Sequence, residues 1–254
     1  MKYSAIVLAG SRPGGDPLAA QFGAAIKALI LVAGEPMVRR PVRALLASEN
    51  IGQVLVMTQD PDALAGVPAA DPRLAICRSG DTIAATLLAL CDDPDVSWPI
   101  LVTTADHALL DAATVDEFCA AAVGSDIAIG VVERNALMRR LPGTRRTWVK
   151  FRGGAFTGAN LFALRSPQVR DAIALWQSVE QDRKKAWRII SLLGPAMLML
   201  AGLRLVSLDE VMMRLGDRLG LRLKAIALTN PLAGVDVDKP EDHALAEAIL
   251  GGRA

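Results

Sequence analysis

The stretch IVLAGSRPGGDPLA, residues 6 to 19, joins an apolar segment directly to a loop that holds three glycines, two prolines and one arginine. The apolar part is short and rich in Val, Ile and Leu, which is typical of a strand buried on both faces. Gly10, Gly14 and Gly15 let the backbone adopt positive φ angles and bring bare N–H groups close to a ligand. Arg12 adds a forked, permanently charged donor. The stretch therefore predicts a buried strand followed by a phosphate cradle, with a plain glycine-rich turn as the alternative.

Two familiar phosphate-binding loops do not match this stretch. A Walker loop ends in Gly-Lys-Ser/Thr, and a dinucleotide-binding loop has the pattern Gly-x-Gly-x-x-Gly with an acidic residue about 20 positions later. Here the glycines are spaced differently, and the charged residue downstream is Lys27, which stands in an otherwise uncharged run at 18–32. A lysine at this place serves a phosphate and not a ribose hydroxyl, although a solvated surface lysine is the alternative interpretation.

The composition narrows the class of protein. With 254 residues and no linker-like stretch, the chain is expected to form a single domain over residues 1–254. A formal net charge of +1 argues against a nucleic-acid binder, which normally carries a basic excess. Cys77, Cys91 and Cys119 lack any Cys-x-x-Cys spacing and are expected to be small core residues in a reducing cytoplasm. The N-terminus lacks the pattern of a secretory signal.

Strand-like and helix-like segments alternate along the chain. The expected strands are residues 4–10, 52–58, 73–78, 99–106 and 126–132, and the expected helices are 37–48, 81–92 and 111–123, the last with Asp111 as its N-cap. Repeated strand–helix units predict an α/β fold of three layers, with a mostly parallel, Rossmann-like sheet and helices on both faces. In such sheets ligands bind beyond the carboxyl ends of the strands, where the glycine loop and TTAD at 103–106 are expected.

The stretch LAGSRPGGDPLA…KALILVAGEPMVRRPVRALLAS, within residues 8–48, resembles the opening signature of the nucleotidyltransferases with a GT-A-like fold. That group contains molybdenum-cofactor guanylyltransferase-like proteins and the sugar-phosphate and alcohol-phosphate nucleotidyltransferases. Segments 79–90, 101–110, 156–164 and 234–250 continue the resemblance in the right order. It implies an enzyme that transfers a nucleoside monophosphate from a nucleoside triphosphate to a phosphorylated acceptor, with Mg²⁺ and release of pyrophosphate.

The resemblance also implies roles for individual residues. The nucleotide would contact Leu8, Ala9, Gly10, Ser11, Arg12, Gly14, Gly15, Lys27, Gly80 and Thr82, and the catalytic groups would be Arg12, Lys27 and Asp106. Asp106 and Asp238 would bind the metal, with Asp236 as the alternative because residues two apart on an extended segment face the same side. The acceptor would contact Lys150, Thr157, Gly158 and Asn160 within 148–164, a stretch that also predicts a β-hairpin with its turn at Gly153-Gly154.

This chemistry needs positioning and cations more than acid–base groups. The acceptor phosphate is already an anion, so no nucleophilic side chain or general base is required. The two histidines, His107 and His243, are accordingly expected to be polar surface or capping groups. Two alternatives are a non-catalytic nucleotide-binding regulatory domain and a nucleotide-sugar glycosyltransferase. The second is weakened because no Asp-x-Asp follows the fourth strand.

Residues 181–220 are expected to form a helical, apolar insertion. Residues 189–203 are 15 positions without a charge, preceded by Arg183, Lys184, Lys185 and Arg188. The run is shorter than the roughly 20 residues that span a bilayer. The alternatives are a buried helical pair, a contact with a second subunit, a pocket for an apolar or lipid-like acceptor, and a peripheral membrane contact through 183–203. The expected location is the cytoplasm or, with that contact, the inner face of the membrane.

Overall fold

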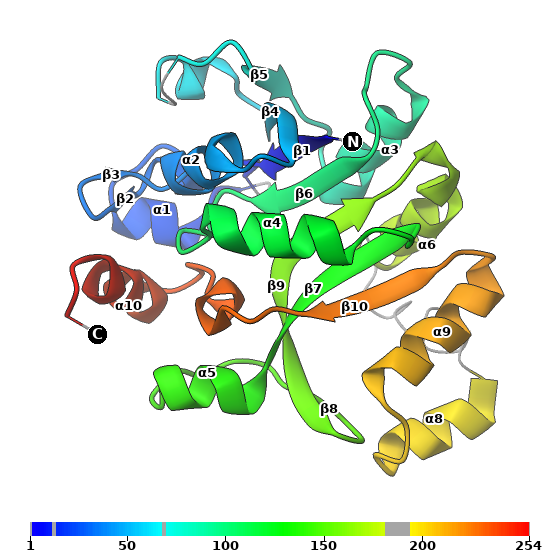
Figure 1. The fold of residues 1–254 in the computed structure, drawn as a ribbon. Coiled ribbons are helices and arrows are strands. Elements are labelled where there is room, and N and C mark those ends of the chain that lie inside the picture. The colour runs from blue at the N-terminus through cyan, green and yellow to red at the C-terminus, as the bar shows by residue number, and fades with distance from the viewer. Residues whose placement is uncertain (1, 12–13, 68–69, 181–193, 254) are drawn as a thin grey trace.

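The computed structural model describes residues 2–11, 14–67, 70–180 and 194–253 of the chain. Within them an eight-stranded sheet runs in the order β10-β7-β9-β6-β1-β4-β5, with β8 paired to β9 (Figure 1). Its strands are β1 (Tyr3–Leu8), β4 (Ile51–Thr58), β5 (Leu74–Arg78), β6 (Ile100–Thr104), β7 (Ile127–Glu133), β8 (Val149–Phe151), β9 (Gly154–Leu164) and β10 (Leu223–Ala227). A separate antiparallel pair joins β2 (Leu31–Val32) to β3 (Glu35–Pro36).

The described helices connect and cover these strands. They are α1 (Pro17–Gln21), α2 (Arg39–Ala47), α3 (Ile83–Asp92), α4 (Ala112–Ala121), α5 (Arg134–Arg140), α6 (Arg170–Glu180), α8 (Gly194–Gly202), α9 (Leu208–Leu219) and α10 (Pro240–Leu250). Short 3₁₀ turns are η1 (Lys27–Leu29), η2 (Asp62–Leu64), η3 (Pro167–Val169) and η5 (Pro231–Gly234). No helix of these described segments is long and apolar enough to span a membrane.

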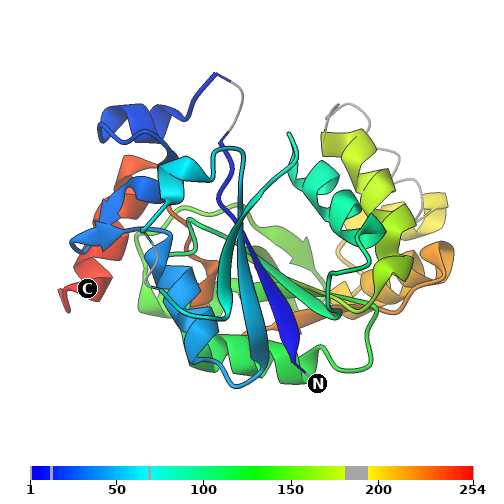
Figure 2. The same ribbon diagram turned by 90° about the horizontal axis from the view of Figure 1, so that it is seen from above.

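The sheet carries a hydrophobic core on each face. One core packs residues of α2 and α4, such as Leu45 and Phe118, against the sheet, and the other packs residues of α3 and α6, such as Leu87 and Ile173. Seen from above, α2 and α4 lie on one side of the sheet and α3 and α6 on the other (Figure 2). The predicted three-layer α/β fold is therefore confirmed, because strands buried on both faces need a helical layer on each.

All five predicted strands and all three predicted helices are present, with small shifts of their ends. The first strand ends at Leu8 and not at residue 10, since the chain leaves the sheet at Ala9 to form the glycine loop. Asp111 is the predicted N-cap of α4, and its carboxylate accepts a hydrogen bond from the Thr114 amide at 2.7 Å.

Strand β9 makes the sheet mixed. It pairs antiparallel with β6 and β7, while the pairs β1–β4, β1–β6, β4–β5 and β7–β10 are parallel. The predicted hairpin at 148–164 is present as β8 and β9, but its turn is one residue earlier than predicted. Gly154 already pairs with Phe151, so Arg152 and Gly153 form the turn, and Gly153 has the left-handed φ of 95° that such a turn requires.

The expected insertion is helical where it is described. Helix α9 packs against β10, and Met212 and Gly216 are its buried residues. Four apolar side chains of this region are exposed, namely Met199, Leu203, Leu205 and Met213. Residues 181–193, with the basic cluster, lie outside the described residues.

Candidate active site

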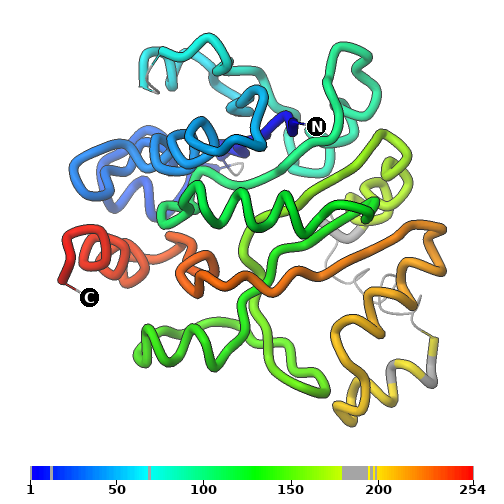
Figure 3. Tube along the Cα trace, viewed as in Figure 1, coloured from blue at the N-terminus to red at the C-terminus, as the bar shows by residue number. Residues whose placement is uncertain are grey.

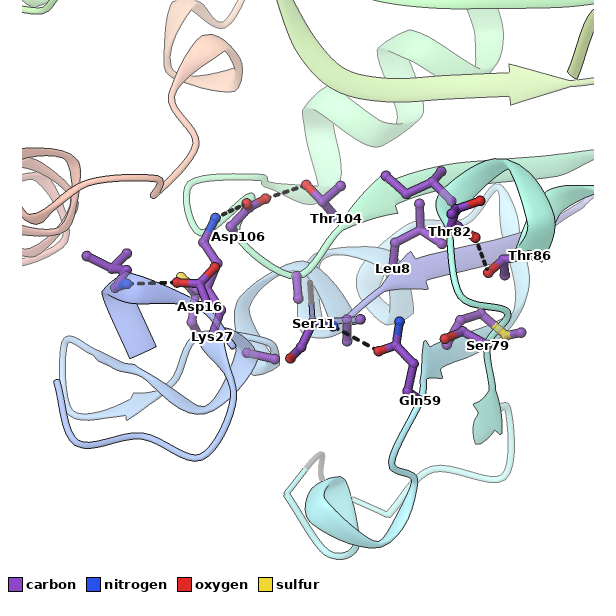
Figure 4. A pocket seen from close by; sticks show the side chains of 18 of the residues that line it. Leu8, Ser11, Asp16, Lys27, Gln59, Ser79, Thr82, Thr86, Thr104 and Asp106 are labelled. Atoms are coloured by element: carbon purple, nitrogen blue, oxygen red, sulfur yellow. Dashed lines mark hydrogen bonds and ion pairs between the residues drawn. The ribbon is translucent and has the colours of Figure 1, made fainter. Parts of the chain in front are cut away.

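A pocket of about 850 Å³ opens where β1, β4 and β6 end. Figure 4 shows Leu8 and Ser11 in its middle, Lys27 and Asp106 on one side, and Gln59, Ser79 and Thr82 on the other. Three neighbouring parallel strands deliver these loops, because parallel strands place their carboxyl ends at the same edge of the sheet. The pocket therefore lies where the sequence predicts a ligand.

Close packing holds the glycine loop against the end of β4. The Ser11 amide donates to Gln59 Oε1 at 2.8 Å. A Cβ atom added at Gly10 would lie 2.8 Å from Gln59 Nε2, so a side chain there displaces the glutamine. The missing side chain at Gly10 thus lets Gln59 lie close to its backbone, and Gly10 itself lines the pocket.

The opposite wall is the turn that begins α3. Thr82 is the N-cap of α3, and its hydroxyl accepts from the Ala85 amide at 3.1 Å. The Gly80 amide donates to Thr86 Oγ1 at 3.0 Å, and a Cβ atom at Gly80 would lie 3.1 Å from the Cβ of Ala85. Both predicted residues of this segment therefore also have structural roles in the turn.

Lys27 lies between two carboxylates at the other end of the pocket. Its Nζ donates to Asp106 Oδ2 at 2.5 Å and to Asp238 Oδ1 at 2.6 Å. Thr104 Oγ1 donates to Asp106 Oδ1 at 2.5 Å, and the Val237 amide donates to the Asp106 carbonyl at 3.1 Å. The predicted lysine and both preferred metal-binding aspartates thus meet, although 211 positions separate Lys27 from Asp238.

Lys27 is a cation at neutral pH. Burial lowers the pKa of its ammonium, but the charge of Asp106 and the hydrogen bonds to Asp106 and Asp238 raise it more, so the pKa lies above its usual value. The side chains of Lys27 and Asp106 are only 17% and 16% exposed, whereas that of Asp238 is 52% exposed. One ammonium and two carboxylates carry a formal net charge of −1, and a net negative charge repels a polyphosphate.

The two carboxylates that contact Lys27 supply the ligand type that divalent cations such as Mg²⁺ take in proteins. The described segments hold no group of three or more His, Cys, Asp or Glu residues able to bind a metal. Two carboxylates suit Mg²⁺ held jointly by protein and phosphate oxygens, since this ion is commonly bound by one or two carboxylates together with substrate phosphates.

Asp236 has other partners than Asp238. Its carboxylate accepts from Arg146 Nη1 and from Asn160 Nδ2, the latter at 3.1 Å, and Asp236 does not line the pocket. Burial and the nearby charge of Asp238 raise the pKa of Asp236, against the effect of Arg146. Asp238 is therefore the residue of this segment that pairs with Lys27, whereas Asp236 pairs with Arg146.

The predicted residues divide into three sets. Leu8, Ala9, Gly10, Ser11, Lys27, Gly80, Thr82, Asp106 and Asp238 line the pocket. Gly14 and Gly15 have the predicted positive φ, 89° and 88°, but they do not line it, and Lys150, Thr157, Gly158 and Asn160 of the hairpin also lie outside its lining. Arg12 lies outside the described residues. Their assignment to phosphates or acceptor therefore stays a prediction.

One of the two places expected for His107, the surface, is wrong. Its side chain is not on the surface but buried, with Nδ1 3.1 Å from Thr103 Oγ1. Burial lowers the pKa of His107 to about 4, so the imidazole is neutral at pH 7. His243 instead bonds the Leu31 carbonyl at 2.7 Å.

Sequence reasoning missed several residues that line the pocket. These are Asp16, Met57, Gln59, Ser79, Asp81, Thr86, Thr104 and Lys239. Gln59 had a usable signal, because it follows a predicted strand directly and so lies at the carboxyl edge of the sheet.

The family match and a curated relative both point to nucleotide-transferring proteins. The chain matches the family described as MobA-like NTP transferase domain over residues 5–195. The 2-C-methyl-D-erythritol 4-phosphate cytidylyltransferase of Bordetella petrii is 37% identical over 111 residues, which are 41% of this chain. The chain thus spans half, 50%, of the length of that curated relative.

Solved structures agree with the sequence match. A hypothetical transferase from Thermus thermophilus is 32% identical with a TM-score of 0.79, over 96% of this chain and 100% of that one. A CMP:2-keto-3-deoxy-manno-octonic acid synthetase complexed with CTP is 15% identical with a TM-score of 0.59, over 100% of both chains. At that identity the second likeness shows a shared fold.

Proposed function

Because the chain belongs to the family of MobA-like NTP transferase domains, we propose that it transfers a nucleoside monophosphate from a nucleoside triphosphate to a phosphorylated acceptor and releases pyrophosphate. The observation that supports this reaction most is Lys27, held between Asp106 and Asp238 at one end of a glycine-lined pocket. The names of two similar proteins refer to cytidylyl transfer and to CTP, so CTP is the proposed donor.

In the proposed reaction an oxygen of the acceptor phosphate attacks the α-phosphorus of the donor. A new P–O bond forms, the bond from the α-phosphorus to the oxygen that bridges it to the β-phosphorus breaks, and pyrophosphate leaves with that electron pair. Charge grows on the phosphoryl oxygens during this exchange. Lys27 is fixed and protonated beside the two carboxylates, so it can stabilise that charge without reorganising.

Mg²⁺ is the proposed cofactor, and Asp106 and Asp238 would hold it. When bound, Mg²⁺ would supply positive charge to the triphosphate oxygens. It would also change the formal net charge of the group of Lys27, Asp106 and Asp238 from negative to positive. Asp106 is oriented for this by Thr104 and is largely buried, whereas the half-exposed Asp238 faces the solvent side.

The acceptor is proposed to lie toward β8 and β9. Lys150, Thr157, Gly158 and Asn160 belong to this hairpin, and Lys150 is exposed there. The proposed acceptor is a small molecule that carries a phosphate. A lipid-like acceptor is the alternative, and an acceptor screen with short-chain and long-chain phosphates separates the two.

A thermal-shift screen tests the donor. CTP, GTP, UTP and ATP are each added with and without Mg²⁺, and CTP is expected to raise the melting temperature most, and only with the metal. A ligand at 100 times its Kd stabilises the fold by about 2.7 kcal/mol. A larger shift of the melting temperature with another triphosphate would replace CTP as the proposed donor, and the proposed reaction class would stay the same.

Turnover separates an enzyme from a binding domain. Pyrophosphate release is measured with CTP, Mg²⁺ and a panel of sugar and alcohol phosphates for the wild type, Asp106→Asn and Asp238→Asn. Both variants are expected to fold and to lose turnover, because each removes a metal-binding oxygen from the pocket and no core contact. Metal-dependent CTP binding with unaltered activity in both variants would rule out this site.

A further inference from the structure

Arg146 is a buried arginine that contacts the C-terminal segment 235–242 at several points. It lies in the loop between α5 and β8, and only 10% of its side chain is exposed. Nη1 donates to Asp236 Oδ1, while Nη2 donates to the Asp236 carbonyl at 3.2 Å and to Asp242 Oδ1 at 2.9 Å. Removing an arginine from water is costly, and these two carboxylates offset part of that cost.

The contacts of Arg146 lie on both sides of Asp238. Asp236 is two residues before it, and Asp242 is four residues after it. Asp242 Oδ2 in turn accepts from the amides of Lys239 at 3.2 Å and Asp238 at 3.4 Å. A single guanidinium therefore contacts the chain on both sides of Asp238, whose carboxylate is half-exposed.

A second contact ties this segment to strand β9. Asn160 Nδ2 donates to Asp236 Oδ2 at 3.1 Å. Asn160 has a φ of 45°, in the left-handed region, and lies opposite the register shift of β7 between Ile129 and Val131. Non-glycine residues rarely adopt this conformation, and they need contacts that compensate its cost. Here the side chain of Asn160 forms a hydrogen bond with Asp236.

We propose that Arg146 is a positioning residue. Through its bonds to Asp236 and Asp242, it fixes the position of the Asp238 carboxylate relative to Lys27 and the proposed metal. This inference rests on the proposed function. Asn160 extends the same network to the strand on which the acceptor is proposed to lie. Groups that orient a metal ligand typically change metal affinity or activity by about 10- to 100-fold when they are lost.

The experiment measures how the CTP-induced shift in melting temperature depends on Mg²⁺ concentration. Arg146→Gln is expected to raise the Mg²⁺ concentration at half effect by about tenfold or more. Arg222→Gln is the control, because Arg222 also pairs with a carboxylate, that of Asp126 at 2.7 Å and 3.0 Å, but lies away from the pocket. The control is expected to leave the Mg²⁺ midpoint unchanged.

Two further variants separate positioning from simple stability. Arg146→Lys keeps the charge but not the planar fork, so it is expected to recover the melting temperature more fully than the Mg²⁺ midpoint. Asn160→Gly tolerates the left-handed φ and removes the side chain that bonds Asp236, so it is expected to fold and to shift the midpoint severalfold in the same direction.

A double-mutant cycle decides whether Arg146 acts through Asp238. If Arg146 acts through Asp238, Arg146→Gln adds nothing to the Mg²⁺ midpoint of Asp238→Asn. Additive effects, or a lower melting temperature in Arg146→Gln with a normal midpoint, overturn the proposal.

Failure of the proposed function is distinguishable from failure of this inference. A wild type that shows no Mg²⁺-dependent shift with any triphosphate refutes the function. Hydrogen exchange of the Val237 amide, which bonds the Asp106 carbonyl at 3.1 Å, then decides the positioning claim. Exchange that is faster in Arg146→Gln and unchanged in Arg222→Gln supports it, and equal exchange in all three proteins overturns it.

Discussion

Lys27 contacts the carboxylates of Asp106 and Asp238, so the role of its charge can be tested directly. Lys27→Met keeps most of the side chain's length and removes the ammonium that contacts Asp106 and Asp238. We expect kcat for pyrophosphate release to fall roughly a hundredfold, since the lost charge stabilises the transition state. This fall corresponds to an activation free energy that is about 2.7 kcal/mol higher. Lys224→Met is the control, because Lys224 bonds the Ala121 carbonyl outside the pocket. A change in KM alone would make Lys27 a ground-state binding group.

Gly10 and Gln59 are expected to be coupled sterically. Gly10→Ala places a Cβ 2.8 Å from Gln59 Nε2, which displaces the glutamine and breaks its bond to the Ser11 amide. We expect weaker CTP binding with little loss of stability, because the atom that must move is the end of a flexible side chain. The measurement is the Kd for CTP in Gly10→Ala, Gln59→Ala and the double variant. A double variant that binds worse than Gln59→Ala by the full effect of Gly10→Ala contradicts the steric explanation.

At the scale of elements, two helix caps separate folding from binding. Thr82 caps α3 at the pocket, and Ser207 caps α9 away from it, where its hydroxyl accepts from the Glu210 amide at 3.2 Å. Replacing either by Ala is expected to lower the free energy of unfolding by about 1 kcal/mol. Only Thr82→Ala should also weaken CTP binding. Equal CTP affinity in both variants would leave Thr82 with a capping role alone.

The pair that joins β7 to β10 predicts a dependence of stability on pH. Hydrogen bonds from the Arg222 side chain and amide lower the pKa of Asp126 to about 2. A depressed pKa stabilises the fold above the unfolded value of about 4, and that contribution disappears as the pH falls toward the folded pKa. Unfolding by urea should therefore show Asp126→Asn less stable than the wild type at pH 7 and nearly equal to it near pH 2. A difference that stays constant with pH would contradict this origin.

At the scale of the whole molecule, the site depends on the meeting of the two ends of the chain. The tube in Figure 3 shows the C-terminal helix beside the N-terminal hairpin of β2 and β3. His243 Nε2 bonds the Leu31 carbonyl at 2.7 Å, its ring lies 4.4 Å from that of Phe22, and Glu247 accepts from the Ala33 amide at 2.5 Å. This contact holds the segment of Lys27 against the segment of Asp238.

His243→Ala tests that dependence. Losing the bond to Leu31 is expected to cost about 1 kcal/mol of unfolding free energy. It should also raise the Mg²⁺ requirement, because Lys27 and Asp238 belong to the two segments that it joins. Thr229→Ala, which removes a 2.8 Å bond to Glu117 elsewhere, should cost similar stability and leave the Mg²⁺ requirement unchanged. If His243→Ala lost stability without any change in its Mg²⁺ requirement, the site would not depend on this contact.

The sequence by itself determined the features that depend on neighbouring residues. Short apolar runs became strands because both of their faces are buried, Asp111 capped its helix because its carboxylate reaches an amide three residues on, and Gly14, Gly15 and Gly153 took positive φ angles because glycine lacks a Cβ. The position of the pocket also followed, since parallel strands present their carboxyl ends at one edge of the sheet.

Only the tertiary structure decided the features that join distant residues. The antiparallel insertion of β9 between β6 and β7, the placing of Gln59 against Gly10, and the pairing of Asp236 with Arg146 have no local signature. The sequence favours Asp238 as the residue of the pocket, but the contacts of Asp236 depend on what packs near it. That packing is fixed by burial over the whole chain, which no short window of sequence contains.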